Sequence, residues 1–237
     1  SKRLLQKNNE LAHANKELDR FVYSVSHDLS APLKSIMGLV NISRMEKDDA
    51  ELRHYFNNIE TSVHKLEAFI GEILDYSRNE RQEVSLENIN LTNLCQEILD
   101  NLRFQEGFDK IQISLEGIDN FSLITDKMRL KIILNNLLSN AVKFQKIIAN
   151  EPPFITVTAK ALATHYSIYV EDNGEGIPPE ARERIFDMFF RGTPRANGSG
   201  LGLYIAREAA EKINGKLTVE SVYGKGSLFH LEIKKYL

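Results

Sequence analysis

The chain has 237 residues, of which 42% are hydrophobic and 27% are charged, and its formal net charge is -3 at pH 7. This composition is typical of a folded globular protein with one or two domains, and it excludes a fibrous or disordered chain. The nearly balanced charge gives no reason to expect nucleic acid as a partner. No stretch approaches the roughly 20 apolar residues of a membrane-spanning helix, so we expect a soluble, cytoplasmic fragment, which leaves open a membrane anchor in the full-length protein.

The N-terminal segment repeats apolar residues every seven positions, which is typical of a coiled-coil seam. The repeat consists of Leu4, Leu11, Leu18 and Val25. Asn8 and Asn15 fall where apolar residues would stabilise the seam more strongly. Residues 1–20 are therefore predicted to form a marginal coiled-coil connector helix.

A second apolar seam follows the charged run at residues 46–49. Its members are Phe56, Ile59, Val63, Leu66, Ile70 and Ile73. Two seamed helices joined by a short polar loop predict an antiparallel helical hairpin over residues 21–80. One hairpin has only a thin core, so we expect two copies to pair as a dimeric four-helix bundle. The polar segment 77–84 is predicted to be the linker to the next domain.

Residues 81–237 mix helical and strand patterns, which predicts an α+β fold. The expected helices cover about 91–105 and 126–145, and the expected strands cover 111–115, 154–159, 167–171, 216–221 and 228–233. Such an order predicts an α/β sandwich with a mixed sheet. The stretch 180–202 is rich in glycine, proline and polar residues and has the composition of a lid. Cys95 lies in an apolar pattern, which favours a buried small side chain over a reactive thiol.

A glycine motif precedes the last predicted helix. It reads Gly198-Ser-Gly200-Leu201-Gly202-Leu203. Glycines before a helix leave backbone amides free to face an anion, and the positive end of the helix adds to the attraction. Alone, such a motif is more often a structural turn than an anion site.

Two further motifs suit a nucleotide. Asp172-Asn-Gly174-Glu-Gly176 follows an apolar strand, so that the carboxylate lies at a strand end where it can accept a hydrogen bond from the exocyclic amine of adenine. Asn136, Asn140 and Lys143 are four and three residues apart on one helix and share a face. Two carboxamides and an ammonium suit a triphosphate with Mg²⁺, which takes few protein ligands and could use the Asn140 oxygen.

His27 stands apart from the other five histidines of the chain. The seam uses Val25 and Leu29, which turns His27 toward solvent. An exposed imidazole has a neutral nucleophilic nitrogen at cellular pH, and a carboxylate can orient its other nitrogen. Neighbours on a helix point about 100° apart, so geometry alone does not nominate Asp28 for that role. Pro32 is predicted to bend the helix one turn later.

The His27 segment and the motifs at 136–143, 172–176 and 198–203 follow one another along the chain in that order. Together they resemble the catalytic core of the sensor histidine kinases of two-component signalling, from about residue 20 to the C-terminus. The resemblance implies a dimerisation and histidine phosphotransfer domain over 21–80. It implies a GHKL-type ATP-binding catalytic domain over 81–237, with helices on one face of the sheet. It also implies that the connector over 1–20 follows an upstream sensor domain that this chain lacks.

The resemblance also assigns roles to residues. It implies that ATP phosphorylates His27, that Asp28 assists, and that the phosphoryl group passes to an aspartate of a response-regulator receiver domain. Asn140 becomes the Mg²⁺ ligand, and Asp172 the contact to the adenine amine. The remaining implied ATP contacts are Asn136, Lys143, Gly174, Gly176, Arg191, Gly198, Gly200, Leu201, Gly202 and Leu203.

One position departs from the family pattern. The family has threonine or asparagine three residues after the acidic residue, where its polar side chain supports dephosphorylation of the regulator, but here that position is Ala31. Because alanine cannot orient a water through its side chain, we expect weak phosphatase activity. Two alternatives to the kinase are an ATPase of the gyrase and chaperone type, which has no use for His27, and a catalytically silent scaffold.

Overall fold

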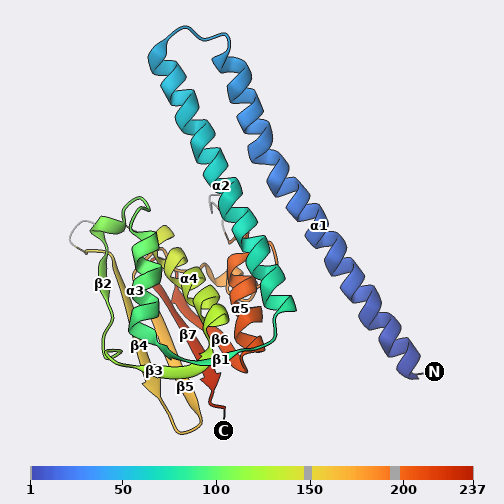
Figure 1. The fold of residues 1–237 in the computed structure, drawn as a ribbon, viewed down its shortest axis with the longest axis vertical. Coiled ribbons are helices and arrows are strands. Elements are labelled where there is room, and N and C mark those ends of the chain that lie inside the picture. The colour runs from blue at the N-terminus through green and yellow to red at the C-terminus, as the bar shows by residue number, and fades with distance from the viewer. Residues whose placement is uncertain (1, 147–150, 193–197, 237) are drawn as a thin grey trace. The chain divides into compact units, whose positions relative to one another are not determined.

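The computed structural model describes residues 2–146, 151–192 and 198–236. Contacts within the chain divide it into two compact units, Ser1–Ile73 and Leu74–Leu237. Figure 1 shows the order of the elements in both units. The division falls inside a helix, so that the last turns of that helix belong to the second unit.

The first unit is a hairpin of two long helices (Figure 1). Helix α1 spans Lys2–Ser43 and α2 spans Asp49–Arg81. Between them, the Asp48 carboxylate accepts a 2.7 Å hydrogen bond from the backbone N–H of Ala50, which caps the start of α2. The predicted antiparallel hairpin is confirmed. Helix α1 continues through Pro32 without interruption of its helical assignment.

The segment predicted as a linker begins instead as helix. Helix α2 continues to Arg81, and Asn79 in its last turn is fully buried within the second unit. The reason is the buried guanidinium of Arg129, which donates to the carbonyl oxygens of Asn79 at 2.9 Å and Gln82 at 2.5 Å. These bonds satisfy carbonyls that a helix end leaves without intrahelical partners. The same guanidinium pairs with the buried carboxylate of Asp126 at 2.8 Å.

The second unit holds a mixed five-stranded sheet in the order β2-β4-β5-β7-β6. Its strands are β2 (Gln112–Ser114), β4 (Phe154–Ala161), β5 (His165–Asp172), β6 (Gly215–Val222) and β7 (Gly226–Lys234). The pairing of β2 with β4 is parallel, and the other pairings are antiparallel. Helices α3 (Leu91–Leu102), α4 (Lys127–Lys143) and α5 (Gly202–Lys212) lie on one face (Figure 1). The predicted α/β sandwich with helices on one face is confirmed.

Two strands escaped prediction from the sequence. Strand β1 (Leu86–Asn90) pairs antiparallel with β3 (Ser122–Asp126) in a separate two-stranded sheet. Both strands run directly into helices: the Asn90 side chain accepts from the Asn93 amide to begin α3, and the Asp126 side chain accepts from the Arg129 amide to begin α4. The pair thus fixes where α3 and α4 start.

The core lies between the sheet and the helices. Alternate residues of the strands, such as Ile155, Val157 and Val170, are buried against the helical layer. Cys95 of α3 is also buried, and burial raises the pKa of its thiol to about 12. A thiol that stays protonated at neutral pH is a poor nucleophile, which favours a structural role for this side chain.

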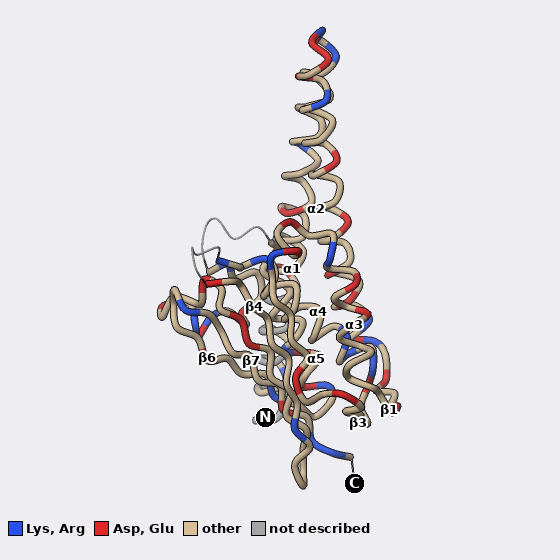
Figure 2. The backbone as a smooth tube through the Cα atoms, turned by 90° about the vertical axis from the view of Figure 1, so that its left-hand side faces the viewer, with Lys and Arg blue, Asp and Glu red and all other residues tan. Residues whose placement is uncertain are grey.

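Charged residues are distributed along the whole chain. Figure 2 shows lysine and arginine interspersed with aspartate and glutamate along α2 and in the second unit. Within the described residues, no helix is long and apolar enough to cross a membrane.

Candidate functional site

The first candidate site is His27 on α1. Its side chain is 68% exposed, as predicted from the seam residues Val25 and Leu29, which are half-buried. The imidazole Nδ1 lies 3.0 Å from Oδ1 of Asp28, whose side chain is only 18% exposed. The side chains of adjacent helical residues therefore do meet here, although the angle between neighbours on a helix gave no reason to expect it. With Nδ1 directed at a carboxylate, Nε2 is the ring nitrogen on the opposite side.

The second candidate site lies in the second unit, where α4 meets the glycine motif. A Cβ atom added to Gly198 would lie 2.8 Å from the Lys143 ammonium nitrogen. One added to Gly202 would overlap the Asn136 carboxamide oxygen. The structure thus brings the glycine motif and the polar face of α4 together. A side chain at either position would displace the Lys143 or Asn136 side chain from the motif.

The glycine motif also fixes the start of α5. Gly200 has a φ of +77°, which favours glycine, and its carbonyl accepts a 3.0 Å hydrogen bond from the Phe189 amide. Leu201 is fully buried and its amide donates to the Ser199 hydroxyl at 3.0 Å. Leu203 is half-buried in the first turn of α5. Buried Leu201 anchors the loop. The backbone N–H groups at the start of α5 therefore point out of the N-terminal end of the helix.

Arg191 lies two residues after Phe189, whose amide bonds to the Gly200 carbonyl. Its side chain is exposed, and with Gly192 it directly precedes residues 193–197 of the predicted lid, which lie outside the described residues. Asn140 lies on α4 between the two residues that approach the glycine motif, Asn136 and Lys143, and is half-buried.

The third element is Asp172 at the end of β5. Its Oδ1 accepts a 2.8 Å hydrogen bond from the Gly174 amide. Burial raises the pKa of the Asp172 carboxyl to about 6, although hydrogen bonds from the backbone N–H groups of Gly174 and Ser227 act in the opposite direction. A carboxyl whose pKa is raised by burial, at the end of a strand, is a candidate for accepting a hydrogen bond from a ligand donor.

The loop after Asp172 is attached to α4 and to the turn between β6 and β7. The Glu175 amide donates to the carbonyl of Phe144 at 2.9 Å, and the Glu175 carbonyl accepts from the Gly224 amide at 2.7 Å. Gly174 has no room for a side chain against the Phe144 carbonyl. Gly176 has a φ of +67°, and a Cβ added there would overlap the Val222 carbonyl. The loop is therefore in backbone contact on both sides.

The turn between β6 and β7 was not singled out from the sequence. Gly226 has a φ of +120°, and a Cβ there would overlap the Asp172 carbonyl. The Ser221 hydroxyl accepts a 2.8 Å hydrogen bond from the Ile177 amide. The sequence signal was the pair Gly224-x-Gly226 between two predicted strands, which reads as an ordinary hairpin turn until its contacts are known.

These residues fit a magnesium nucleotide. The glycine motif is a cradle that any Cβ would fill, and it faces an ammonium and a carboxamide. An α-helix of 11 residues begins at its end, which supplies a positive helix terminus for phosphate. The Asn140 carboxamide offers the kind of oxygen ligand that Mg²⁺ accepts alongside its waters. Within the described residues, no cluster of three or more His, Cys, Asp or Glu side chains could hold a metal by itself.

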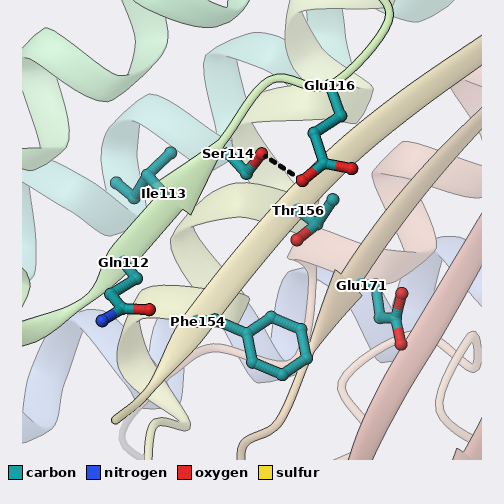
Figure 3. A pocket seen from close by; sticks show the side chains of 7 residues that line it. All are labelled: Gln112, Ile113, Ser114, Glu116, Phe154, Thr156 and Glu171. Carbon is teal, nitrogen blue, oxygen red and sulfur yellow. Dashed lines mark hydrogen bonds between the residues drawn. The ribbon is translucent and has the colours of Figure 1, made fainter.

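A separate hollow of about 560 Å³ lies on the opposite side of the sheet (Figure 3). Its lining residues are Gln112, Ile113, Ser114, Glu116, Phe154, Thr156 and Glu171. Phe154 and Thr156 alternate along β4 with the core residues, so they face away from the helices. None of the residues predicted for the nucleotide site lines this hollow.

An exposed histidine on a helical hairpin and a nucleotide cradle on an α/β sandwich together define a two-domain histidine kinase core. Residues 17–82 match the family model of the His Kinase A phospho-acceptor domain. Residues 125–237 match the model of the histidine kinase-, DNA gyrase B- and HSP90-like ATPases. The chain belongs to the sensor histidine kinases.

Similar proteins agree with this assignment. The chain is 34% identical over 236 residues to the aerobic respiration control sensor protein ArcB of Escherichia coli K12, covering 94% of this chain but 29% of ArcB. Histidine kinase ThkA, solved in complex with response regulator protein TrrA, has a TM-score of 0.73 and 26% identity, covering 97% of this chain and 66% of that one. Full-length ShkA in complex with AMPPNP has a TM-score of 0.63 and 25% identity, and the match covers 92% of this chain and 46% of that one. The chain thus spans less than a third of the length of ArcB.

Proposed function

We propose that this chain catalyses phosphorylation of its own His27 by ATP and then passes the phosphoryl group to an aspartate of a response-regulator receiver domain. The observation that carries the proposal is the geometry at His27. Its ring is largely exposed, as an acceptor that meets two different partners must be, and Nδ1 lies at hydrogen-bonding distance from the Asp28 carboxylate. The His Kinase A family match over this segment supports the same residue.

Asp28 prepares the imidazole for attack. A proton on Nδ1 that is held by the carboxylate leaves the lone pair on Nε2, which becomes the nucleophile. In the transfer, a bond forms between Nε2 and the γ-phosphorus, and the bond from that phosphorus to the bridging oxygen breaks, with its electron pair leaving on ADP. The ring gains positive charge as the bond forms, and the adjacent Asp28 carboxylate stabilises it.

The second unit would hold ATP. Asp172 accepts a hydrogen bond from the adenine amine, and Gly174 and Gly176 let the backbone approach the ring. Asn136, Lys143 and Arg191 contact the phosphates together with the amides of the glycine motif. Asn140 would bind Mg²⁺, which offsets charge on the phosphates during the transfer. ATP is an intracellular substrate, so we place this reaction in the cytoplasm.

We also propose that the active form is a homodimer. In the single chain, the hairpin leaves many large apolar side chains exposed. They include Leu11, Leu18, Val22, Leu33, Met37, Phe56 and Val63. Pairing of two hairpins in a four-helix bundle would bury them at a gain of about 25 cal/mol for each Å² of apolar surface.

Two further partners follow from the proposed reaction. A receiver domain would dock at His27, and the complex of ThkA with TrrA is a precedent in a similar protein. An upstream sensor domain would act through the connector helix.

Because Ala31 supplies no polar side chain, we expect little dephosphorylation of the regulator, whereas Ala31→Thr should raise it. Equal regulator dephosphorylation by both proteins would argue against this role of position 31.

The proposal is tested by incubating the chain with γ-labelled ATP and Mg²⁺. The wild type should acquire acid-labile, base-stable label, and His27→Gln should acquire none. His64→Gln is a matched control, because the His64 side chain is also 68% exposed and its Nδ1 lies 3.2 Å from the Glu67 carboxylate. Label retained on His27→Gln would refute the assignment of the acceptor. ATP hydrolysis without any labelled protein would favour an ATPase.

A further inference from the structure

The Ser221 hydroxyl lies beneath the loop that begins at Asp172. The side chain is on β6 and the residue is 8% exposed. It accepts a 2.8 Å hydrogen bond from the Ile177 amide and donates a 2.8 Å hydrogen bond to the Gly226 carbonyl. A third contact of 3.0 Å joins it to the Ser227 hydroxyl.

These contacts use the whole hydrogen-bonding capacity of the group. A serine hydroxyl has one donor and two acceptor sites. Since its proton goes to Gly226 and one lone pair accepts from Ile177, the Ser227 hydroxyl must donate to the remaining lone pair. Ser221 and Ser227 are buried, at 8% and 9% exposed, so removal of the Ser221 oxygen takes a hydrogen-bonding partner from three polar groups where little water can replace it.

Ser221 joins the Ile177 amide to the Gly226 carbonyl, and each of these groups belongs to a segment that adjoins Asp172. Ile177 ends the loop that starts at Asp172. Gly226 precedes Ser227, whose backbone N–H donates to the Asp172 carboxylate and which pairs with Asp172 in the strand register. Ser221 therefore connects the far end of the loop to the strand start that orients the carboxylate.

We infer that Ser221 is a positioning residue for adenine recognition, acting through the loop 172–177 and the strand start at 226–227. This inference rests on the proposed role of Asp172 in binding the adenine amine. A carboxylate discriminates for an amine only when its oxygens are held at the right place and direction. Loss of the Ser221 hydroxyl loosens the loop and the strand start, which together hold Asp172. It therefore reduces the preference for ATP over a nucleotide that lacks the exocyclic amine.

The test compares two nucleotides on the full chain. Affinity is measured for ATP and for purine riboside triphosphate, which lacks the exocyclic amine. Ser221→Ala should weaken ATP binding about tenfold, which corresponds to about 1.4 kcal/mol, and should change binding of the second nucleotide much less. Thermal unfolding is followed in parallel. A general structural role would weaken both nucleotides equally and leave their ratio unchanged.

Ser167→Ala is the matched control. Ser167 is a buried serine of the same sheet, 1% exposed, and its hydroxyl lies 3.1 Å from Nε2 of His230, a residue outside the loop. It should bind both nucleotides as the wild type does. Ser221→Cys keeps the shape with a weaker hydrogen-bonding group and should show an intermediate ratio, which preserves the test if Ser221→Ala does not fold.

The outcomes separate this inference from the proposed function. If the wild type prefers ATP to purine riboside triphosphate and Ser221→Ala keeps the same preference, the inference is overturned and the proposed function stands. Wild-type protein that binds neither nucleotide would overturn the proposed function, and the inference with it. A reduced ratio in Ser221→Ala and Ser221→Cys, but not in Ser167→Ala, supports the positioning role.

Discussion

The helical hairpin and the sheet unit present their functional groups in opposite ways. In the hairpin, the proposed phosphoryl acceptor is one exposed side chain, and it is paired with its neighbour in the sequence, Asp28. In the sheet unit, the site is made by backbone amides, close glycine contacts and a largely buried carboxyl, with partners that are distant in the sequence. The Ile177 amide, for example, bonds to Ser221, 44 positions later.

This difference predicts how each unit responds to substitution. An exposed side chain can be replaced with loss of chemistry but little loss of stability. In a site built from backbone and buried polar groups, each group is another group's hydrogen-bonding partner, so a substitution there should change stability as well as binding. The four predictions below test this contrast, beginning with the largest expected effect.

Arg129→Met should destabilise the sheet unit by about 3 kcal/mol or more, because it leaves the Asp126 carboxylate buried without its cationic partner and uncaps the end of α2. Chemical denaturation checks this value. Lys131→Met is the control on the same helix: its ion pair with Glu97 is about half exposed, so little change in stability is expected. Equal losses in the two variants would show that burial of the Arg129 pair does not set its importance.

Gly226→Ala should cost about 2–4 kcal/mol, since alanine is strained at a φ of +120° and its Cβ would overlap the Asp172 carbonyl. ATP binding should weaken as well, because the strand start that orients Asp172 must move. Thermal unfolding and nucleotide titration measure the two effects. Gly107→Ala separates strain from overlap, because Gly107 also has a positive φ, +81°, but beyond its chain neighbours no atom of the described residues lies within 4 Å of its Cβ position.

Asp172→Asn should change binding and stability in opposite directions. The folded pKa is raised to about 6, so the carboxylate weakens the nucleotide-free fold as pH rises from about 4 through 6, and the neutral amide should be more stable at pH 7. ATP affinity of the wild type should fall below pH 6, as protonation removes the acceptor for the amine. The variant should bind ATP weakly and lack this component of the pH dependence. The titration of ATP itself is common to both proteins, so identical pH profiles would contradict the role of Asp172.

The same contrast explains what the sequence could predict. His27, the glycine motif and the polar face of α4 were visible because each is a local pattern, read within a few residues. Arg129 and Ser221 were not, because their importance comes from partners 50 and 44 positions away, respectively. Strands β1 and β3 are short and pair across more than 30 residues, so neither pattern alone predicted the pair.

Gly38→Ala should have the smallest effect, a stabilisation of the hairpin by about 0.5–1 kcal/mol, because glycine disfavours a helix interior. Apart from the neighbouring backbone of the helix itself, no atom of the described residues lies within 4 Å of the added methyl. Thermal unfolding of the full chain measures it, with Gly71→Ala as the equivalent change in α2. Because the open space is that of one chain, a loss of stability at either position would mean that the second hairpin of the proposed dimer occupies it. That result, repeated at several protein concentrations, would locate the dimer contact on that face, and a gain at both positions would place the contact elsewhere along the seam.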